Sequence, residues 1–319
     1  MNYNRGLLFW GLALITGGAV ALAAQQGYID RELLAGAWRL WPLILVAIGL
    51  SILLSRTPAA IVGTIVAALV VGTAGGALIA VGPGIASCGG SEPATLVTRN
   101  GAFGDEAQVL LDFNCGTLDL ATTDDVDWTV QSGRVGGDPA RITASGDRLE
   151  IEAGQGDRGW GAGRQRWIVS LPTRTSYQLD ISPNAAETTI DLGGGRFTTV
   201  SLHPNAGSVT LVLTDAQVNE LDLSLNAGSA SIVIGSAMEM SAALSVNAGS
   251  IELCTTGDVA LQVTSDPNIT FSTNLDDSGL LQNGDTWSTP GYAAASEQVS
   301  IQLSGNAGSF TLNPEEGCS

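Results

Sequence analysis

A short motif that begins with asparagine recurs at a fixed interval through the second half of the chain. Its copies begin at Asn184, Asn205, Asn226 and Asn247, so each copy starts 21 residues after the one before. The last three copies read Asn-Ala-Gly-Ser, and the first reads Asn-Ala-Ala-Glu. A repeat of this length indicates a solenoid, in which each repeat forms one coil and neighbouring coils bury a common core.

Apolar residues keep the same register between the motifs. The sixth residue after each asparagine is apolar in every copy: Ile190, Leu211, Ile232 and Leu253. Around this position apolar and polar residues alternate, which is the period of a strand with one buried face. We therefore expect an all-β domain, a single-stranded right-handed β-helix or solenoid with coils of about 21 residues.

The asparagine motif suits a corner between two strands. Asparagine and glycine tolerate positive φ, and an asparagine side chain can bond the neighbouring backbone. Identical corners stacked on one another can form a ladder of side-chain amides. We expect such a structural ladder at Asn184, Asn205, Asn226, Asn247 and Asn306. The alternative is that these asparagines line a ligand groove.

The boundaries of the solenoid follow from weaker copies of the motif. Asn114 begins a similar corner, and Asn268 keeps the phase but lacks the Ala-Gly-Ser that follows. The Gly- and Asp-rich residues 274–296 separate Asn268 from the restored motif and are expected to form an inserted loop. We expect a linker over residues 88–106 and the β-helix domain over 107–319.

The first 87 residues have a different composition, and we expect a helical membrane domain there. Residues 6–24 carry no charge, and nineteen helical residues are long enough to cross a hydrocarbon core of about 30 Å. A second apolar stretch runs from residue 33 to 54, and a third from 58 to 86. These stretches predict three transmembrane spans and a multi-pass membrane protein.

Orientation cannot be assigned from the loop charges, because Arg5 and Arg56 balance Arg31 and Arg39. The four cysteines all lie in the β-domain: Cys88, Cys115, Cys254 and Cys318. An even number of cysteines suits an oxidising compartment, so we place the β-domain outside the cytoplasm. Three pairings are possible, and chain order favours the first cysteine with the second and the third with the fourth. The alternative is four reduced, buried thiols.

Charge excludes several classes of function. The chain carries −18, of which residues 1–87 contribute +2 and the remainder −20, so nucleic acid is not expected as a partner. There is no lysine, and His203 is the single histidine. The acidic run Asp124, Asp125 and Asp127 is read as a solvated turn rather than a calcium site. We expect no enzyme, no cofactor, no metal and no small-molecule substrate.

One segment departs from the acidic background. Three arginines and two tryptophans lie within eleven residues, residues 157–167, among several glycines. Arginine and tryptophan often anchor interfaces, so we take this segment as a candidate interaction loop: Arg158, Trp160, Arg164, Arg166 and Trp167. The alternative is a long hairpin in which Trp167 enters the core and the arginines neutralise nearby acids.

Two sets of residues carry a family resemblance. The opening Arg5-Gly6-Leu7-Leu8-Phe9-Trp10-Gly11, with Leu40-Trp41-Pro42-Leu43-Ile44-Leu45, resembles the membrane unit of LiaI and LiaF type bacterial envelope proteins. Trp167-Ile168-Val169-Ser170-Leu171-Pro172, leading into the repeats, resembles the toastrack domain of LiaF and PspC relatives, a β-helix-like fold.

The resemblance implies a bacterial cell-envelope protein that senses or transmits envelope stress, or acts as a scaffold. Its expected partner is a sensor kinase or a phage-shock-type regulator, and no enzymatic residues are attributed to the fold. The repeats would also suit an adhesin-like or self-assembling structural β-solenoid. The two classes differ at the ends of the solenoid, because a polymer needs open, pairable terminal coils.

Overall fold

The computed structural model describes most of the second part of the chain and short stretches of the first. The described residues are 10–12, 14–16, 18–19, 67–73, 95–135, 139–154, 164–236, 238–266 and 272–314. Two compact units divide the chain, Met1–Ser87 and Cys88–Ser319.

The described residues of the first unit are helical. No helix among them has both the length and the apolar character that a membrane crossing requires. The three predicted spans lie almost entirely outside the described residues.

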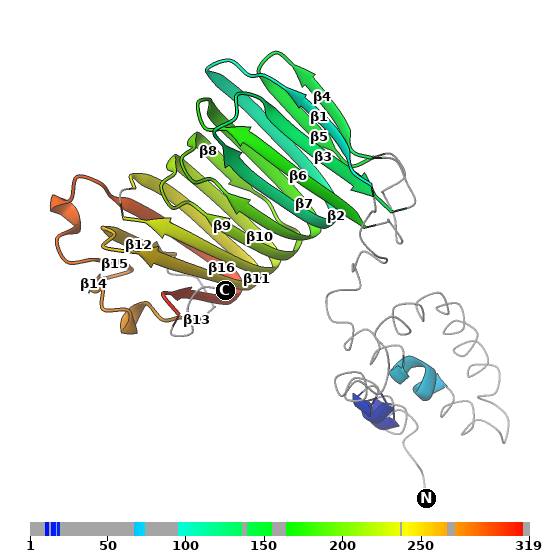
Figure 1. Cartoon of the computed structure of the whole chain (residues 1–319). Coiled ribbons are helices and arrows are strands. Elements are labelled where there is room, and N and C mark those ends of the chain that lie inside the picture. The colour runs from blue at the N-terminus through cyan, green and yellow to red at the C-terminus, as the bar shows by residue number, and fades with distance from the viewer. Residues whose placement is uncertain are drawn as a thin grey trace, which may run out of the picture. The chain divides into compact units, whose positions relative to one another are not determined.

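The second unit is built from β-strands that join into one sixteen-stranded sheet (Figure 1). The elements in chain order are β1 (Val97–Gly101), β2 (Glu106–Thr123), β3 (Trp128–Arg134), β4 (Arg141–Ser145), β5 (Arg148–Glu152), β6 (Gln165–Pro172), β7 (Ser176–Asp191), β8 (Arg196–Leu202), β9 (Ala206–Val212), β10 (Gln217–Gly235), β11 (Met240–Thr256), β12 (Leu261–Ser265), β13 (Ser272–Thr273), η3 (Leu275–Asp277), β14 (Leu281–Asn283), β15 (Thr286–Ser288), η4 (Tyr292–Ala294) and β16 (Val299–Leu312).

The longest strands run through the asparagine corner and pair on both sides of it. Before the corner, Leu179 of β7 pairs with Val200 of β8, and Leu221 of β10 pairs with Ala242 of β11. After the corner, β7 pairs with β9, β9 with β10 and β10 with β11, all in parallel. The coils therefore stack as a parallel ladder, the arrangement that the repeat predicts.

The core is a continuous column of inward-facing side chains. Ile190, Leu211, Ile232 and Leu253 are fully buried and occupy the same position in successive coils. Burial of each such side chain contributes about 1.5–3 kcal/mol. Toward the N-terminal end aromatic rings fill the column, where Trp167 packs edge-on against Phe113 with ring centroids 4.8 Å apart. This end of the core is thus wide enough for large rings.

Neither end of the ladder follows chain order. β2 lies between β6 and β7, and β16 lies between β11 and β12. Asn306 therefore stacks on Asn247, and β12 and β13 pair with the other edge of β16. A Cβ on Gly308 would lie 2.1 Å from the carbonyl oxygen of Gly249, so the glycine lets this rung approach β11 closely.

Part of the expected linker is a strand. Val97–Gly101 forms β1, which pairs antiparallel with β3 at the edge of the sheet. Its residues are mostly exposed, so they lack the alternation of apolar and polar residues that marks a half-buried strand. The expectation of a linker through residue 106 is therefore wrong for these residues.

The expected insertion over residues 274–296 has secondary structure of its own. It contains η3, the hairpin β14–β15 and η4, and β15 pairs antiparallel with β12. The insertion thereby covers the free edge of β12. The outermost strands at both ends of the sheet, β1 and β4 at one end and β15 and β14 at the other, are antiparallel to their neighbours.

Candidate interaction site

The asparagine side chains form a chain of hydrogen bonds along the corner. Each Nδ2 donates to the Oδ1 of the asparagine in the coil before it, at distances between 2.5 and 2.9 Å. The donors are Asn184, Asn205, Asn226, Asn247 and Asn306, and Asn114 accepts the first bond. The amides are therefore engaged with one another, which fits a structural ladder better than a ligand groove.

Glycines two residues after the asparagines allow the coils to approach each other closely. Gly207, Gly228 and Gly249 have φ between 118° and 148°. A Cβ on any of them would lie 2.0 Å from the carbonyl oxygen of the preceding coil. A side chain at any of these three glycines would separate the coils, whereas the first copy carries Ala186 at the same register.

The structure describes only some residues of the candidate interaction loop. Arg158 and Trp160 lie outside the described residues. Arg164 precedes β6 and Arg166 lies within it, and both are partly exposed. Trp167, one residue further, is completely buried. Including Trp167 in an interaction loop is therefore wrong, because its indole is part of the core.

Arg164 and Arg166 line a pocket of about 230 Å³ on the outer surface of the sheet. Asp119 of β2 and Glu187 of β7 also line it, and β2 lies between β6 and β7. Thr117 pairs with Arg166 on one side and with Glu187 on the other, so cations and carboxylates lie on successive strands. The pocket presents both signs of charge, which suits recognition of a polar group.

Other candidate groups form no site among the described residues. The acidic turn is held by hydrogen bonds from Thr123 to Asp125 and from Thr173 to Asp124. His203 is exposed just after β8. In the described part of the chain no three His, Cys, Asp or Glu side chains gather in a way that could hold a metal ion.

Both cysteines in the described part, Cys115 and Cys254, are disulfide-bonded. Cys115 is the residue after Asn114 in β2, and Cys254 lies in β11. Their expected partners, Cys88 and Cys318, lie outside the described residues.

The fold and its surfaces define a β-solenoid domain joined to a separate N-terminal unit, and the comparisons identify both parts. Residues 96–235 match the family described as the N-terminal domain of toast_rack, DUF2154. Residues 8–53 match the LiaI-LiaF-like transmembrane region. The resemblance seen in the sequence is thus confirmed for both parts of the chain. This combination fits an envelope protein.

Solved structures with some likeness come from bacteria. A "putative cell adhesion protein" from Clostridium sporogenes is 12% identical, with 68% of this chain and 99% of that chain covered and a TM-score of 0.40. A "putative adhesin" from Bacteroides fragilis is 9% identical, with 70% and 100% covered and a TM-score of 0.29. No curated protein matches the sequence.

Proposed function

We propose that this protein is a non-enzymatic integral membrane protein of the bacterial cell envelope that senses or transmits envelope stress through its β-solenoid. The observation that carries the proposal is the union, on one chain, of a segment similar to the LiaI-LiaF-like transmembrane region and one similar to the toast_rack N-terminal domain. The membrane segment anchors the protein, and the solenoid offers a rigid surface for a partner such as a sensor kinase or a phage-shock-type regulator.

The adhesin-like or self-assembling alternative is less well supported. Growth of a solenoid into a fibre requires terminal coils that accept a further parallel coil. Here the outermost strands β1, β4 and β14 are each antiparallel to the neighbour that they pair with. A second copy added in the same sense would not continue the parallel ladder.

A deletion strain tests the regulatory role. Loss of the gene should change transcription of an envelope-stress reporter after treatment with a cell-wall antibiotic. The full chain should restore the response, and a chain that lacks residues 95–314 should not, although it retains the membrane segment. A response that is identical in the deletion strain and the parent would refute the regulatory role.

An export-dependent reporter enzyme tests the membrane topology. With three spans, the ends lie on opposite sides, so a fusion after Leu312 should be active and one after Arg56 inactive. The opposite pattern would place the solenoid in the cytoplasm and remove the argument from oxidised cysteines.

We also propose that Arg158, Trp160, Arg164 and Arg166 contact an anionic partner. The support is that Arg164 and Arg166 line an outer pocket and follow the other two residues closely in the sequence. Changing Arg158, Arg164 and Arg166 to Ser should abolish binding of the detergent-solubilised chain to anionic vesicles, while Arg174→Ser should not. Binding should weaken toward physiological salt, where the screening length is about 8 Å. A triple variant that binds as well as the parent would overturn this assignment.

A further inference from the structure

The two ends of the solenoid are finished differently. At the C-terminal end the chain supplies its own closing strand, because β15 pairs antiparallel with β12. At the N-terminal end the last strands are β1, paired with β3, and β4, paired with β5. Within the described residues no further strand pairs with the outer edge of β1 or β4. In the part of the chain that the structure describes, each of these two strands therefore presents a row of backbone N–H and C=O groups along its outer edge.

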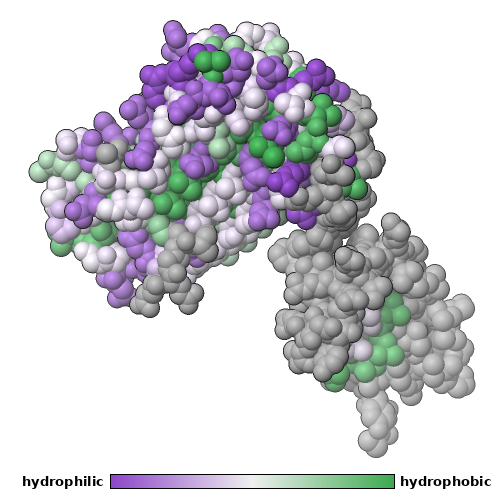
Figure 2. All heavy atoms as spheres, in the orientation of Figure 1, coloured by the Kyte–Doolittle hydropathy of each residue, from purple (hydrophilic) through white to green (hydrophobic). Residues whose placement is uncertain are grey.

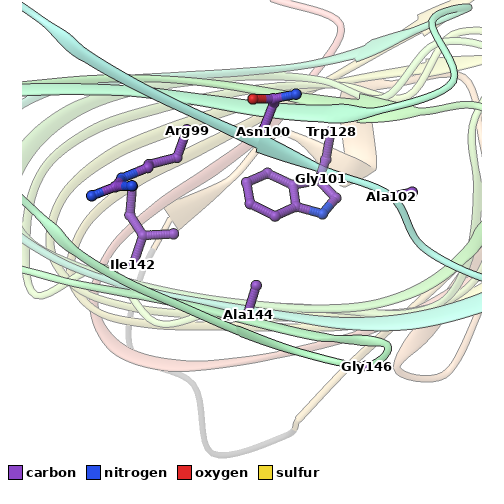
Figure 3. A pocket seen from close by; sticks show the side chains of 8 residues that line it. All are labelled: Arg99, Asn100, Gly101, Ala102, Trp128, Ile142, Ala144 and Gly146. Carbon is purple, nitrogen blue, oxygen red and sulfur yellow. The ribbon is translucent and has the colours of Figure 1, made fainter.

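A slot of about 310 Å³ lies between β1 and β4 (Figure 3). Ile142 and Ala144 of β4 line one side, and the indole of Trp128 lies across from them beside β1. Trp128 fits against β1 because Gly101 has no side chain: a Cβ there would lie 2.7 Å from its Cζ2 atom. The slot is thus the open end of the apolar interior between the strands.

Apolar side chains are also exposed around the slot. Val97, the first residue of β1, is 46% exposed, and Ile142 is only partly buried against the core. Figure 2 shows hydrophobic residues gathered over the end of the solenoid where β1, β3, β4 and β5 lie. An apolar surface of this kind beside free strand edges is typical of a site that receives a partner.

One side chain gives the slot a charge. Arg99 of β1 lines it, and its guanidinium makes no ion pair or hydrogen bond with any described residue. The neighbouring arginines of β4 and β5 have carboxylates nearby, since Arg141 lies 3.8 Å from Glu152 and Arg148 lies 3.6 Å from Glu150. Among the described residues, no carboxylate or carbonyl pairs with the Arg99 guanidinium, which leaves it available to a ligand in the slot.

We infer that the slot between β1 and β4 binds an extended peptide segment of a partner protein. The segment adds a strand to the free edge, places alternate apolar side chains over Trp128 and Ile142, and directs a carboxylate to Arg99. This inference rests on the proposed function, in which the solenoid acts by protein contact.

A peptide of another protein fits the slot better than a second copy of this chain. In a symmetric pair the same patch meets itself, so two copies of Arg99 would approach each other. Each copy would also bring a strongly acidic domain, because residues 88–319 carry −20. A short apolar peptide with one carboxylate can pair with the cation and adds far less negative charge than a second domain.

Synthetic peptides test the inference on the full chain in detergent. The probe is a short peptide in which valine alternates with threonine and one threonine is replaced by aspartate, and its control carries asparagine instead. Fluorescence anisotropy should show that the aspartate peptide binds roughly tenfold more tightly than the asparagine peptide, as expected for a charge-assisted hydrogen bond.

Variants of the chain locate the binding. Arg99→Gln should reduce the preference for aspartate to near unity, and Ala144→Glu, which places a carboxylate in the slot, should weaken binding about tenfold or more. Arg174→Gln removes an exposed arginine elsewhere on the solenoid and should change nothing. Far-UV circular dichroism checks that each variant keeps its β-structure.

Three results would overturn the inference. These are the absence of binding to the parent chain, binding that Arg99→Gln and Ala144→Glu leave unchanged, and self-association in sedimentation that both variants abolish, which would make a second copy the occupant. Failure of the proposed function has a different outcome. If the peptide binds as expected but the deletion strain keeps its stress response, the regulatory role is wrong and the peptide site stands.

Discussion

Glycine at the asparagine corner sets the distance between coils. Gly228 has a φ of 123°, and a Cβ on it would lie 2.0 Å from the carbonyl oxygen of Gly207. We predict that Gly228→Ala lowers the free energy of unfolding by about 3 kcal/mol or more, because the backbone becomes strained and the coils must separate. Thermal unfolding followed by far-UV circular dichroism would measure the loss.

A matched control for this prediction is Gly146→Asn. Gly146 has a φ of 57° with open space around it, and asparagine tolerates that conformation. The melting temperature of the Gly146→Asn variant should stay close to that of the parent. Equal melting temperatures for both variants would contradict a steric role for the glycine column.

Tyr177 is a buried side chain through which the stability of the fold depends on alkaline pH. Burial raises the pKa of Tyr177 to about 12, against the opposing effects of a hydrogen bond with Thr175 and the charge of Arg174. Its hydroxyl donates a 2.8 Å hydrogen bond to the carbonyl of Pro172. In the unfolded chain the tyrosine loses this proton near pH 10. The stabilisation of the folded state by the protonated Tyr177 is therefore complete below about pH 10 and disappears between about pH 10 and 12.

We therefore predict that Tyr177→Phe loses about 1 kcal/mol of stability at neutral pH, from the lost hydrogen bond. Between about pH 10 and 12 the free energy of unfolding of the parent should fall by a further amount of about 2–3 kcal/mol, and that of the variant should not. Urea unfolding at a series of pH values would reveal this difference. A decline equally steep in both proteins would mean that Tyr177 does not cause it.

At the scale of elements, the hairpin β14–β15 protects an edge of the sheet. Trp287 pairs with Val263 of β12, and its indole N–H donates to Asp276 at 2.9 Å. We predict that replacing residues 281–288 by a short Gly-Ser link causes concentration-dependent association, because the edge of β12 becomes available. Sedimentation velocity would detect it, and Leu281→Ser, which keeps the hairpin, should behave as the parent does.

The sequence predicted the strands in the repeated part of the chain, but it did not predict those outside the repeats. The 21-residue period fixes the coils from β7 to β11, since each carries its own corner and apolar register. The period cannot say that Asn306 stacks on Asn247, because neighbours in space need not be neighbours in sequence. Likewise β1 was missed because an exposed edge strand has no buried face to mark it.

The candidate site was predictable only in part. The local density of arginine indicated Arg164 and Arg166, but Asp119 and Glu187 come from two other strands and no local pattern joins them. Trp167 was included in the candidate loop because of its arginine neighbours, and the alternative, in which it enters the core, agrees with its burial. Trp167, Val169 and Leu171 alternate as in a strand. For such residues the strand period was the better guide.

At the scale of the whole molecule, the strand registers limit which cysteines can pair. Cys115 lies in β2 and Cys254 in β11, four rungs away, so about 19 Å of ladder separates them. A disulfide spans at most about 7 Å between Cα atoms, so these two are not partners of each other. Leu312 pairs with Leu253, which brings the end of β16 beside Cys254.

We predict the pairs Cys88–Cys115 and Cys254–Cys318. Mass spectrometry of unreduced peptides should find these two linkages, and each should stabilise the fold by a few kcal/mol (about 2–4) by restricting the unfolded chain. Four free thiols in protein purified without reductant, or a peptide joining the first cysteine to the last, would refute the pairing.

The position of β16 between β11 and β12 has a consequence for the order in which the protein assembles. β12 is synthesised before β16, its parallel partner. The edge of β12 that pairs with β16 therefore stays unpaired until residues 299–312 have been made. Such non-local pairing is slow to form, so this rung closes late in folding. A chain that stalls before residue 299 would expose the edges of both β11 and β12, which marks an unfinished molecule for proteolysis.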